Sequence, residues 1–161
     1  MTGAATGPVV FAYDGSELAK IAVAEAAGQL NHGRQALVVT VWQPFNVGFL
    51  PPHELRIDAA ASDEVRAAAE QTAEQGASLA EAAGFRARSM AVEATPTWSG
   101  IVEAADDHHA SLIVLGSHGR TRLASVLIGS VAEAVAAHSR RSLLIAHRSE
   151  QGRLSRNPDD A

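Results

Sequence analysis

Five short apolar runs alternate along this chain with longer segments of helical periodicity. Apolar runs bounded by turn residues predict strands, and near-continuous runs are typical of parallel strands covered on both faces. The order βαβαβαβαβ predicts right-handed crossovers with helices on both faces of the sheet. We therefore expect a doubly wound, five-stranded parallel α/β sheet. Its strands are predicted within residues 8–13, 34–42, 85–93, 111–115 and 143–146.

Four helices are predicted between these strands. Ser16 is a suitable N-cap for the first, and residues 59–83 form the longest. Residues 96–109 form the third, and the fourth runs over residues 130–138, where Ser130 and Glu133 fit a capping box. The stripe that we expect to be buried in the long helix comprises Val65, Ala68, Ala69, Thr72, Gly76, Leu79 and Ala83.

The length and composition favour one globular domain. The chain has 161 residues, which is enough for a substantial core. Apolar residues make up 47% of the chain but aromatic residues only 4%, so Ala, Val, Leu and Ile must build that core. We place the domain at residues 8–148 and expect flexible termini at 1–7 and 149–161, where small or polar residues give no core signal.

Charge and composition also exclude several classes of protein. The net charge of −5 argues against a nucleic-acid-binding surface, and the absence of cysteine excludes disulfides and thiolate metal sites. No apolar run is long enough for a transmembrane helix, so we expect no membrane partner. Because the first residues lack the charged and apolar regions of a signal peptide, we expect a cytoplasmic protein.

The strongest candidate for a binding site is the glycine-rich segment 116–130, which follows an apolar run and precedes a helix. Glycines let backbone N–H groups approach a phosphate, and a helix N-terminus attracts anions. The segment is neither a Walker A loop nor a dinucleotide fingerprint. From these local features alone, an anion site and a simple turn with a capped helix are equally favoured.

A family resemblance favours the anion site. The spacing Gly116-x2-Gly119-x9-Gly129-Ser130 resembles the G-2x-G-9x-G-[S/T] ATP motif of the universal stress protein family. The segments LIVLGSHGR, LIGSVAE, VVFAYDGS and VVTVWQP are also similar to that family. The resemblance covers residues 8–148, and it implies a Rossmann-like fold of the adenine nucleotide alpha-hydrolase-like type.

The resemblance implies ATP and Mg²⁺ as ligands and gives a role to each matching position. Asp14 corresponds to the acidic residue near the ribose and the phosphate-bound metal, although Asp-Gly-Ser is also an ordinary turn sequence. The carboxylate suits Mg²⁺, which prefers one or two carboxylates together with phosphate oxygens. The other implied positions are Ala12 and Tyr13 at the same strand end, Val41 for adenine, Gly116, Gly119 and Arg120 for ribose and phosphates, and Gly129, Ser130 and Val131 for the phosphate tail.

The resemblance further implies a nucleotide-dependent regulatory module in the stress response, and a homodimer formed through the C-terminal strand. We assign no catalytic residue, because no general base or water-positioning residue stands out. Two alternatives remain open. One is a slow ATPase or autophosphorylating phosphotransferase that uses hydroxyls near the phosphates, namely Ser117, Thr121, Ser125 or Ser130. The other is a dimeric structural module whose nucleotide site is unused.

Overall fold

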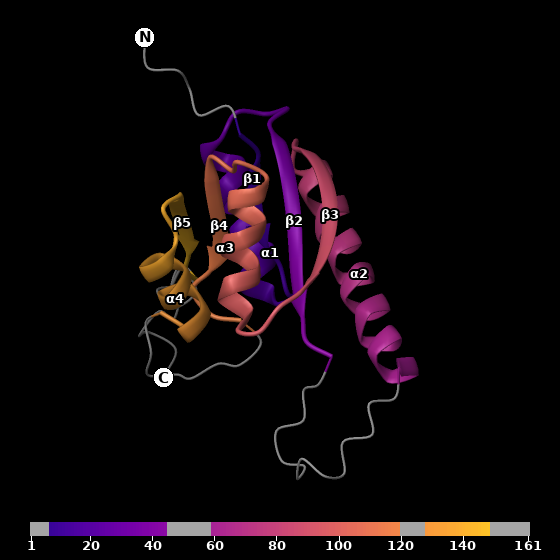
Figure 1. Ribbon diagram of the computed structural model, residues 1–161. Helices are drawn as coiled ribbons and strands as arrows, with labels where there is room; N and C mark the ends of the chain where they lie inside the picture. Colours follow the sequence, from indigo (N-terminus) through magenta and orange to yellow (C-terminus); the bar gives the residue numbers. More distant parts are fainter. Residues whose placement is uncertain (1–6, 45–58, 120–127, 149–161) are drawn as a thin grey trace, which may run out of the picture.

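The computed structural model describes residues 7–44, 59–119 and 128–148. Within them, five parallel strands form one sheet in the order β3-β2-β1-β4-β5 (Figure 1). This confirms the predicted doubly wound parallel sheet. The strands are β1 (Val9–Ala12), β2 (Gln35–Trp42), β3 (Arg86–Glu93), β4 (Leu112–Gly116) and β5 (Ser142–Ala146).

The described helices lie on both faces of the sheet. They are α1 (Glu17–Gln29), α2 (Ala59–Ala82), α3 (Thr97–Asp107) and α4 (Ser130–His138). α1 and α2 bury one face, in a core that includes Phe11, Val23 and Phe85. α3 and α4 bury the other face, in a core that includes Leu37 and Val135 (Figure 1). No helix among the described residues is long and apolar enough to cross a membrane.

The small residues of the core allow helices and sheet to approach closely. Gly76 of α2 lies so near the sheet that an added Cβ would stand 2.6 Å from Tyr13 Cδ1 and 2.8 Å from Val38 Cγ1. The aromatic contact in this core is an edge-to-face pair of Phe11 and Phe85, with ring centroids 5.2 Å apart. The position of α2 on the sheet therefore depends on the missing side chain of Gly76.

The prediction for the buried stripe of α2 is wrong at its N-terminal end. Val65 is 40% exposed and Ala68 is also exposed, whereas burial begins at Ala69. The reason is length: α2 has 24 residues, which span about 36 Å, whereas the eight residues of β3 span only about 26 Å. α2 consequently projects past the carboxyl edge of the sheet (Figure 1).

β1 lies between β2 and β4, and this position creates a crevice at the carboxyl ends of the strands. The chain leaves β1 toward α1 on one face and leaves β4 toward α4 on the other face. In open α/β sheets, ligands bind at such a switch point. The topology therefore indicates where the functional site should lie.

Candidate functional site

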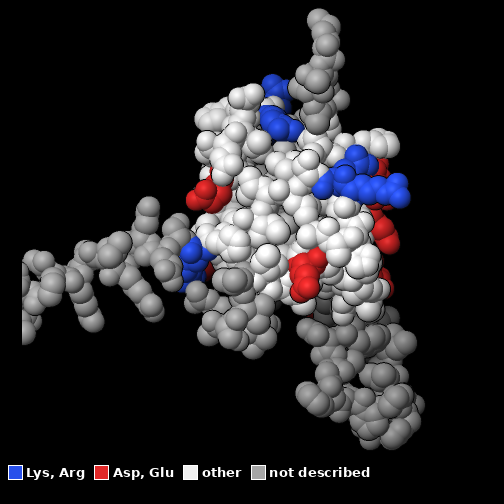
Figure 2. Space-filling model, turned by 90° about the vertical axis from the view of Figure 1, so that its left-hand side faces the viewer, with Lys and Arg blue, Asp and Glu red and all other residues white. Residues whose placement is uncertain are grey.

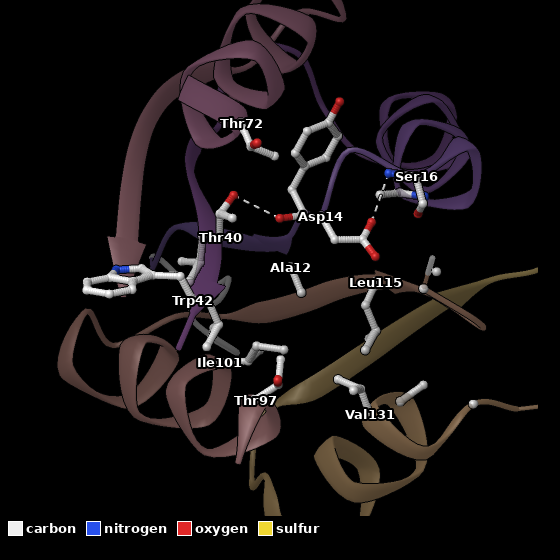
Figure 3. Close-up of a pocket in the computed structure, with 18 of the residues that line it drawn as sticks. Ala12, Asp14, Ser16, Thr40, Trp42, Thr72, Thr97, Ile101, Leu115 and Val131 are labelled. Atoms are coloured by element: carbon white, nitrogen blue, oxygen red, sulfur yellow. Dashed lines mark hydrogen bonds between the residues drawn. The ribbon is translucent and has the colours of Figure 1, made fainter. Parts of the chain in front are cut away.

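A cleft of about 540 Å³ lies at this switch point, which is within the usual range for small-molecule sites (Figure 3). Arg120 lies outside the described residues. The other nine predicted residues all line the cleft: Ala12, Tyr13, Asp14, Val41, Gly116, Gly119, Gly129, Ser130 and Val131. The fold thus brings together positions that are more than one hundred residues apart in the sequence.

The turn between β1 and α1 fixes the position of Asp14. Ser16 N donates a hydrogen bond to Asp14 Oδ1 over 2.9 Å, and Ser16 Oγ accepts one from Ala19 N over 3.2 Å. Ser16 is the N-cap of α1, as predicted. Gly15 adopts a φ of 78°, which residues with a Cβ rarely adopt. Asp14 is therefore both a turn residue and part of the cleft wall.

Gly119 faces the carboxylate of Asp14 from the loop that follows β4. A Cβ added to Gly119 would stand 2.8 Å from Asp14 Oδ2, so a side chain at this position would collide with the carboxylate. Among the described residues, no group of three or more His, Cys, Asp or Glu side chains could hold a metal ion. A single carboxylate suits Mg²⁺ that arrives with phosphate oxygens, because Mg²⁺ seldom uses an all-protein cage.

Backbone hydrogen bonds hold the described ends of the glycine-rich segment together. Ser117 N donates to Ala146 O of β5 over 2.8 Å, and Gly129 N donates to Ser117 O over 2.6 Å. The two outer glycines also have packing roles: a Cβ would stand 2.9 Å from Leu18 Cβ at Gly116, and 3.0 Å from Ser117 O at Gly129. Substitutions at these glycines would therefore disturb the fold as well as the cleft.

The N-terminus of α4 opens into the cleft, but the predicted capping box is wrong. Gly129 is the N-cap, with no side-chain cap hydrogen bond, and Ser130 is the first helical residue. The cap lies one residue earlier than predicted because the bond from Gly129 N to Ser117 O fixes Gly129 beside β4. The first N–H groups of α4, including those of Ser130 and Val131, have no partner within the helix and mark its positive end.

Tyr13 lines the cleft, and the residue also belongs to the core. The residue is 5% exposed and packs with the α1 and α2 side of the sheet. Tyr13 N donates to Val39 O over 2.9 Å, and Thr40 Oγ1 donates to Tyr13 O over 2.8 Å. These bonds hold the ends of β1 and β2 together: Ala12 is paired with Val39, and Val41 lies two residues beyond that pair. Both Ala12 and Val41 line the cleft.

Several lining residues were not predicted from the sequence. Thr97 and Ile101 come from α3, Trp42 ends β2, and a stripe of α2 forms another wall. His118 also lines the cleft: its Nδ1 lies 3.1 Å from Ser117 Oγ, and its buried Nε2 has no partner among the described residues. The only signal for the α2 wall in the sequence is the excess length of the predicted helix over the predicted strands.

A comparison with protein families decides what kind of protein this fold and cleft belong to. The model of the universal stress protein family matches residues 6–147, nearly the whole chain. The chain belongs to the universal stress protein family. This confirms the resemblance drawn from the glycine spacing and the flanking strands.

Individual relatives agree with this assignment. Universal stress protein MJ0577 of Methanocaldococcus jannaschii is 37% identical over 68 residues, which cover 42% of this chain and 41% of that protein. The match in sequence thus spans less than half of that relative's length. A solved structure of MJ0577 superimposes with a TM-score of 0.71 at 24% identity, covering 91% of this chain and 99% of the other, so it supports the fold.

Two other solved universal stress proteins contain nucleotides. One, in complex with cAMP, has a TM-score of 0.63 at 27% identity and covers 91% of this chain and 100% of the other. The second, from Archaeoglobus fulgidus in complex with dAMP, has a TM-score of 0.55 at 21% identity and covers 88% of this chain and 98% of the other. Both are adenine nucleotide complexes within the same family and fold.

Proposed function

We propose that the cleft binds an adenine nucleotide, with Mg·ATP as the ligand, and that the protein is a nucleotide-dependent regulatory module of the stress response. The observation that carries this proposal is the meeting of Asp14, Gly119 and the N-terminus of α4 in one cleft. A carboxylate, a loop without side-chain bulk and the positive end of a helix dipole suit a phosphate chain with its metal. The cAMP complex of a relative supports the choice of an adenine nucleotide.

The phosphates would be bound mainly by backbone groups. The described residues that line the cleft include no Lys or Arg, so the N–H groups of Ser130 and Val131 and the Ser130 hydroxyl would provide the donors, because Gly129 N already donates to Ser117 O. Gly116 and Gly119 would let the ribose and phosphates approach the backbone. Arg120 would add a cation from its place beside Gly119. Mg²⁺, when bound at Asp14, would neutralise phosphate charge.

The base would lie near the ends of β1 and β2. Ala12 is small, and the pairing of β2 with β1 ends at Val39, so Val41 lies beyond the end of β1, where it lines the cleft. A backbone N–H and carbonyl at Val41 can pair with the donor and acceptor edge of adenine. Side chains at these positions would then set the room for the base, and the backbone would set its orientation.

We also propose that two copies associate through β5. β5 is an edge strand of the sheet, and an unpaired strand edge is stabilised when another strand covers it. Figure 2 views the molecule from the β5 side and shows a largely uncharged central area. Arg141 donates to Asp106 Oδ1 over 2.9 Å and to Ala110 O over 3.1 Å, so these bonds hold it against the end of α3. The ion pair with Asp106 thus offsets the charge of Arg141, whereas Arg140 is exposed.

The proposal is tested by calorimetric titration of Mg·ATP into nucleotide-free protein. Gly119→Ala places a Cβ against Asp14 Oδ2 and should weaken binding by about tenfold or more, the equivalent of about 1.4 kcal/mol. Gly28→Ala is the control, because a Cβ there meets nothing within 4 Å. Wild-type protein that binds no nucleotide at millimolar concentration would sink the proposal and leave the structural-module alternative. Phosphate release from the same samples measures the ATPase alternative.

A further inference from the structure

The projecting end of α2 carries an apolar stripe that faces the cleft. Val65, Ala68, Ala69 and Thr72 follow one another at positions i, i+3, i+4 and i+7, which places them on one face of the helix. All four line the cleft, and Val65 is 40% exposed. The stripe thus extends the buried face of α2 beyond the edge of the sheet, where none of the described strands covers it.

The other side of the same helix segment has the opposite character. Arg66 forms ion pairs with Asp63 over 3.4 Å and with Glu70 over 3.9 Å, and all three side chains are more than half exposed. A helix segment that faced only solvent would be polar on every side. The change from apolar to charged around this segment shows that its apolar side is the one that lines the cleft.

The apolar stripe of α2 and its neighbours have few hydrogen-bonding groups available to a ligand. Thr72 Oγ1 already donates to Ala68 O over 2.9 Å, and Thr40 Oγ1 donates to Tyr13 O over 2.8 Å. None of the α2 residues that line the cleft is charged. Figure 3 shows Thr72 and Thr40 above Ala12, Trp42 to its left, and Ile101 and Val131 below it. A flat, uncharged group suits such a surface, whereas a phosphate does not.

We propose that this stripe is the wall that contacts the nucleotide base and selects a purine by size. The inference rests on the proposed function and adds to it a specificity determinant, because none of the positions implied by the family motif lies on α1 or α2. The small side chains of Ala68 and Ala69 leave room for a two-ring base, and a pyrimidine would leave part of the apolar wall uncovered. We expect ATP to bind about tenfold or more tightly than CTP, since burial of apolar surface is lost with the smaller base.

The test compares two neighbouring alanines of α2, of which one lines the cleft and the other does not. Ala68→Phe fills the space beside the wall, whereas Ala67→Phe adds the same bulk at an exposed residue that is absent from the cleft lining. Adjacent helical residues point about 100° apart, so the two variants add the same side chain to the same helix but direct it to different sides. Each variant and the wild type are titrated with Mg·ATP, with Mg·CTP and with magnesium tripolyphosphate, which has no base. Equal affinities of the wild type for ATP and CTP would overturn the selection of a purine.

Ala68→Phe should lose about tenfold or more in affinity for ATP and keep the tripolyphosphate affinity, while Ala67→Phe changes neither. Equal ATP affinity of the two variants would overturn the inference and leave the proposed function standing. Equal loss of both ligands in a folded Ala68→Phe protein would also overturn it, because the wall would then act on the phosphates. If Ala68→Phe does not fold, Val65→Ser is titrated in its place, because the Val65 side chain is already 40% exposed and the change should be tolerated. Weaker binding of ATP with unchanged binding of tripolyphosphate would then support the inference, and unchanged binding of ATP would overturn it. Wild-type protein that binds neither ligand would refute the proposed function itself.

Discussion

Gly76→Ala should destabilise the protein although it improves the intrinsic helix propensity of α2. The new Cβ would stand 2.6 Å from Tyr13 Cδ1 and 2.8 Å from Val38 Cγ1, closer than carbon atoms pack. Tyr13 is 5% exposed and Val38 is fully buried, so neither neighbour can move into solvent. Overpacking of a dense core lowers the free energy of unfolding by about 1–3 kcal/mol, and two such contacts place the loss at about 3 kcal/mol.

The gain in helix propensity from Gly to Ala offsets about 1 kcal/mol of this cost. The free energy of unfolding should therefore fall by about 2 kcal/mol, and Tm by roughly 4–8 °C for a domain of this size. Urea denaturation followed by circular dichroism measures the first quantity, and calorimetry the second. Gly28→Ala is the matched control: it lies in α1 with nothing within 4 Å of the new Cβ, so it should be neutral or slightly stabilising. A Gly76→Ala protein as stable as the Gly28→Ala protein would refute the close packing of α2 on the sheet.

Three further predictions follow from other contacts. Ser16→Ala removes the acceptor for Ala19 N and should lower the free energy of unfolding by about 1 kcal/mol in urea titrations; an unchanged midpoint would refute the cap. Leu143→Glu places a charge on half-buried β5 and should convert a dimer of 16.8 kDa chains to a monomer in sedimentation, whereas a wild type that already sediments as a monomer would contradict the β5 pairing. Asp14→Asn should keep its turn bond to Ser16 N but weaken Mg·ATP more than metal-free ATP, and equal weakening would argue against a metal at this carboxylate.

The fold could be predicted from the sequence because each element carries its own signal. The five apolar runs, the turn at Asp14 and Gly15 and the cap at Ser16 are local features, and the topology follows from their alternation. The glycine spacing further placed Gly116, Gly119 and Gly129 at one site. All three line the cleft together with Asp14, although more than one hundred residues separate Asp14 from Gly119.

The features that could not be predicted from the sequence depend on how the helices and strands pack against one another. The cap of α4 lies at Gly129 because Gly129 N donates a hydrogen bond to Ser117 O, and a local sequence pattern does not predict this contact. The packing role of Gly116 against Leu18, and of Gly76 against Tyr13, likewise exists only once α1 and α2 lie on the sheet. The α2 wall of the cleft arises because α2 is longer than the strands it covers. The helical periodicity predicts a buried stripe, but the N-terminal part of this stripe lines the cleft.

Binding of a nucleotide in the cleft at the switch point can be followed residue by residue in an NMR titration with Mg·ATP. We expect the backbone amides of Gly116, Gly119 and Ser130 to shift in a saturable way. The amides of Arg34 and Ser111, which lie at the opposite end of the strands and share a hydrogen bond of 2.6 Å between their side chains, should stay unchanged. Saturable shifts at Arg34 and Ser111 without shifts in the cleft, or no shifts at millimolar nucleotide, would contradict binding in the cleft.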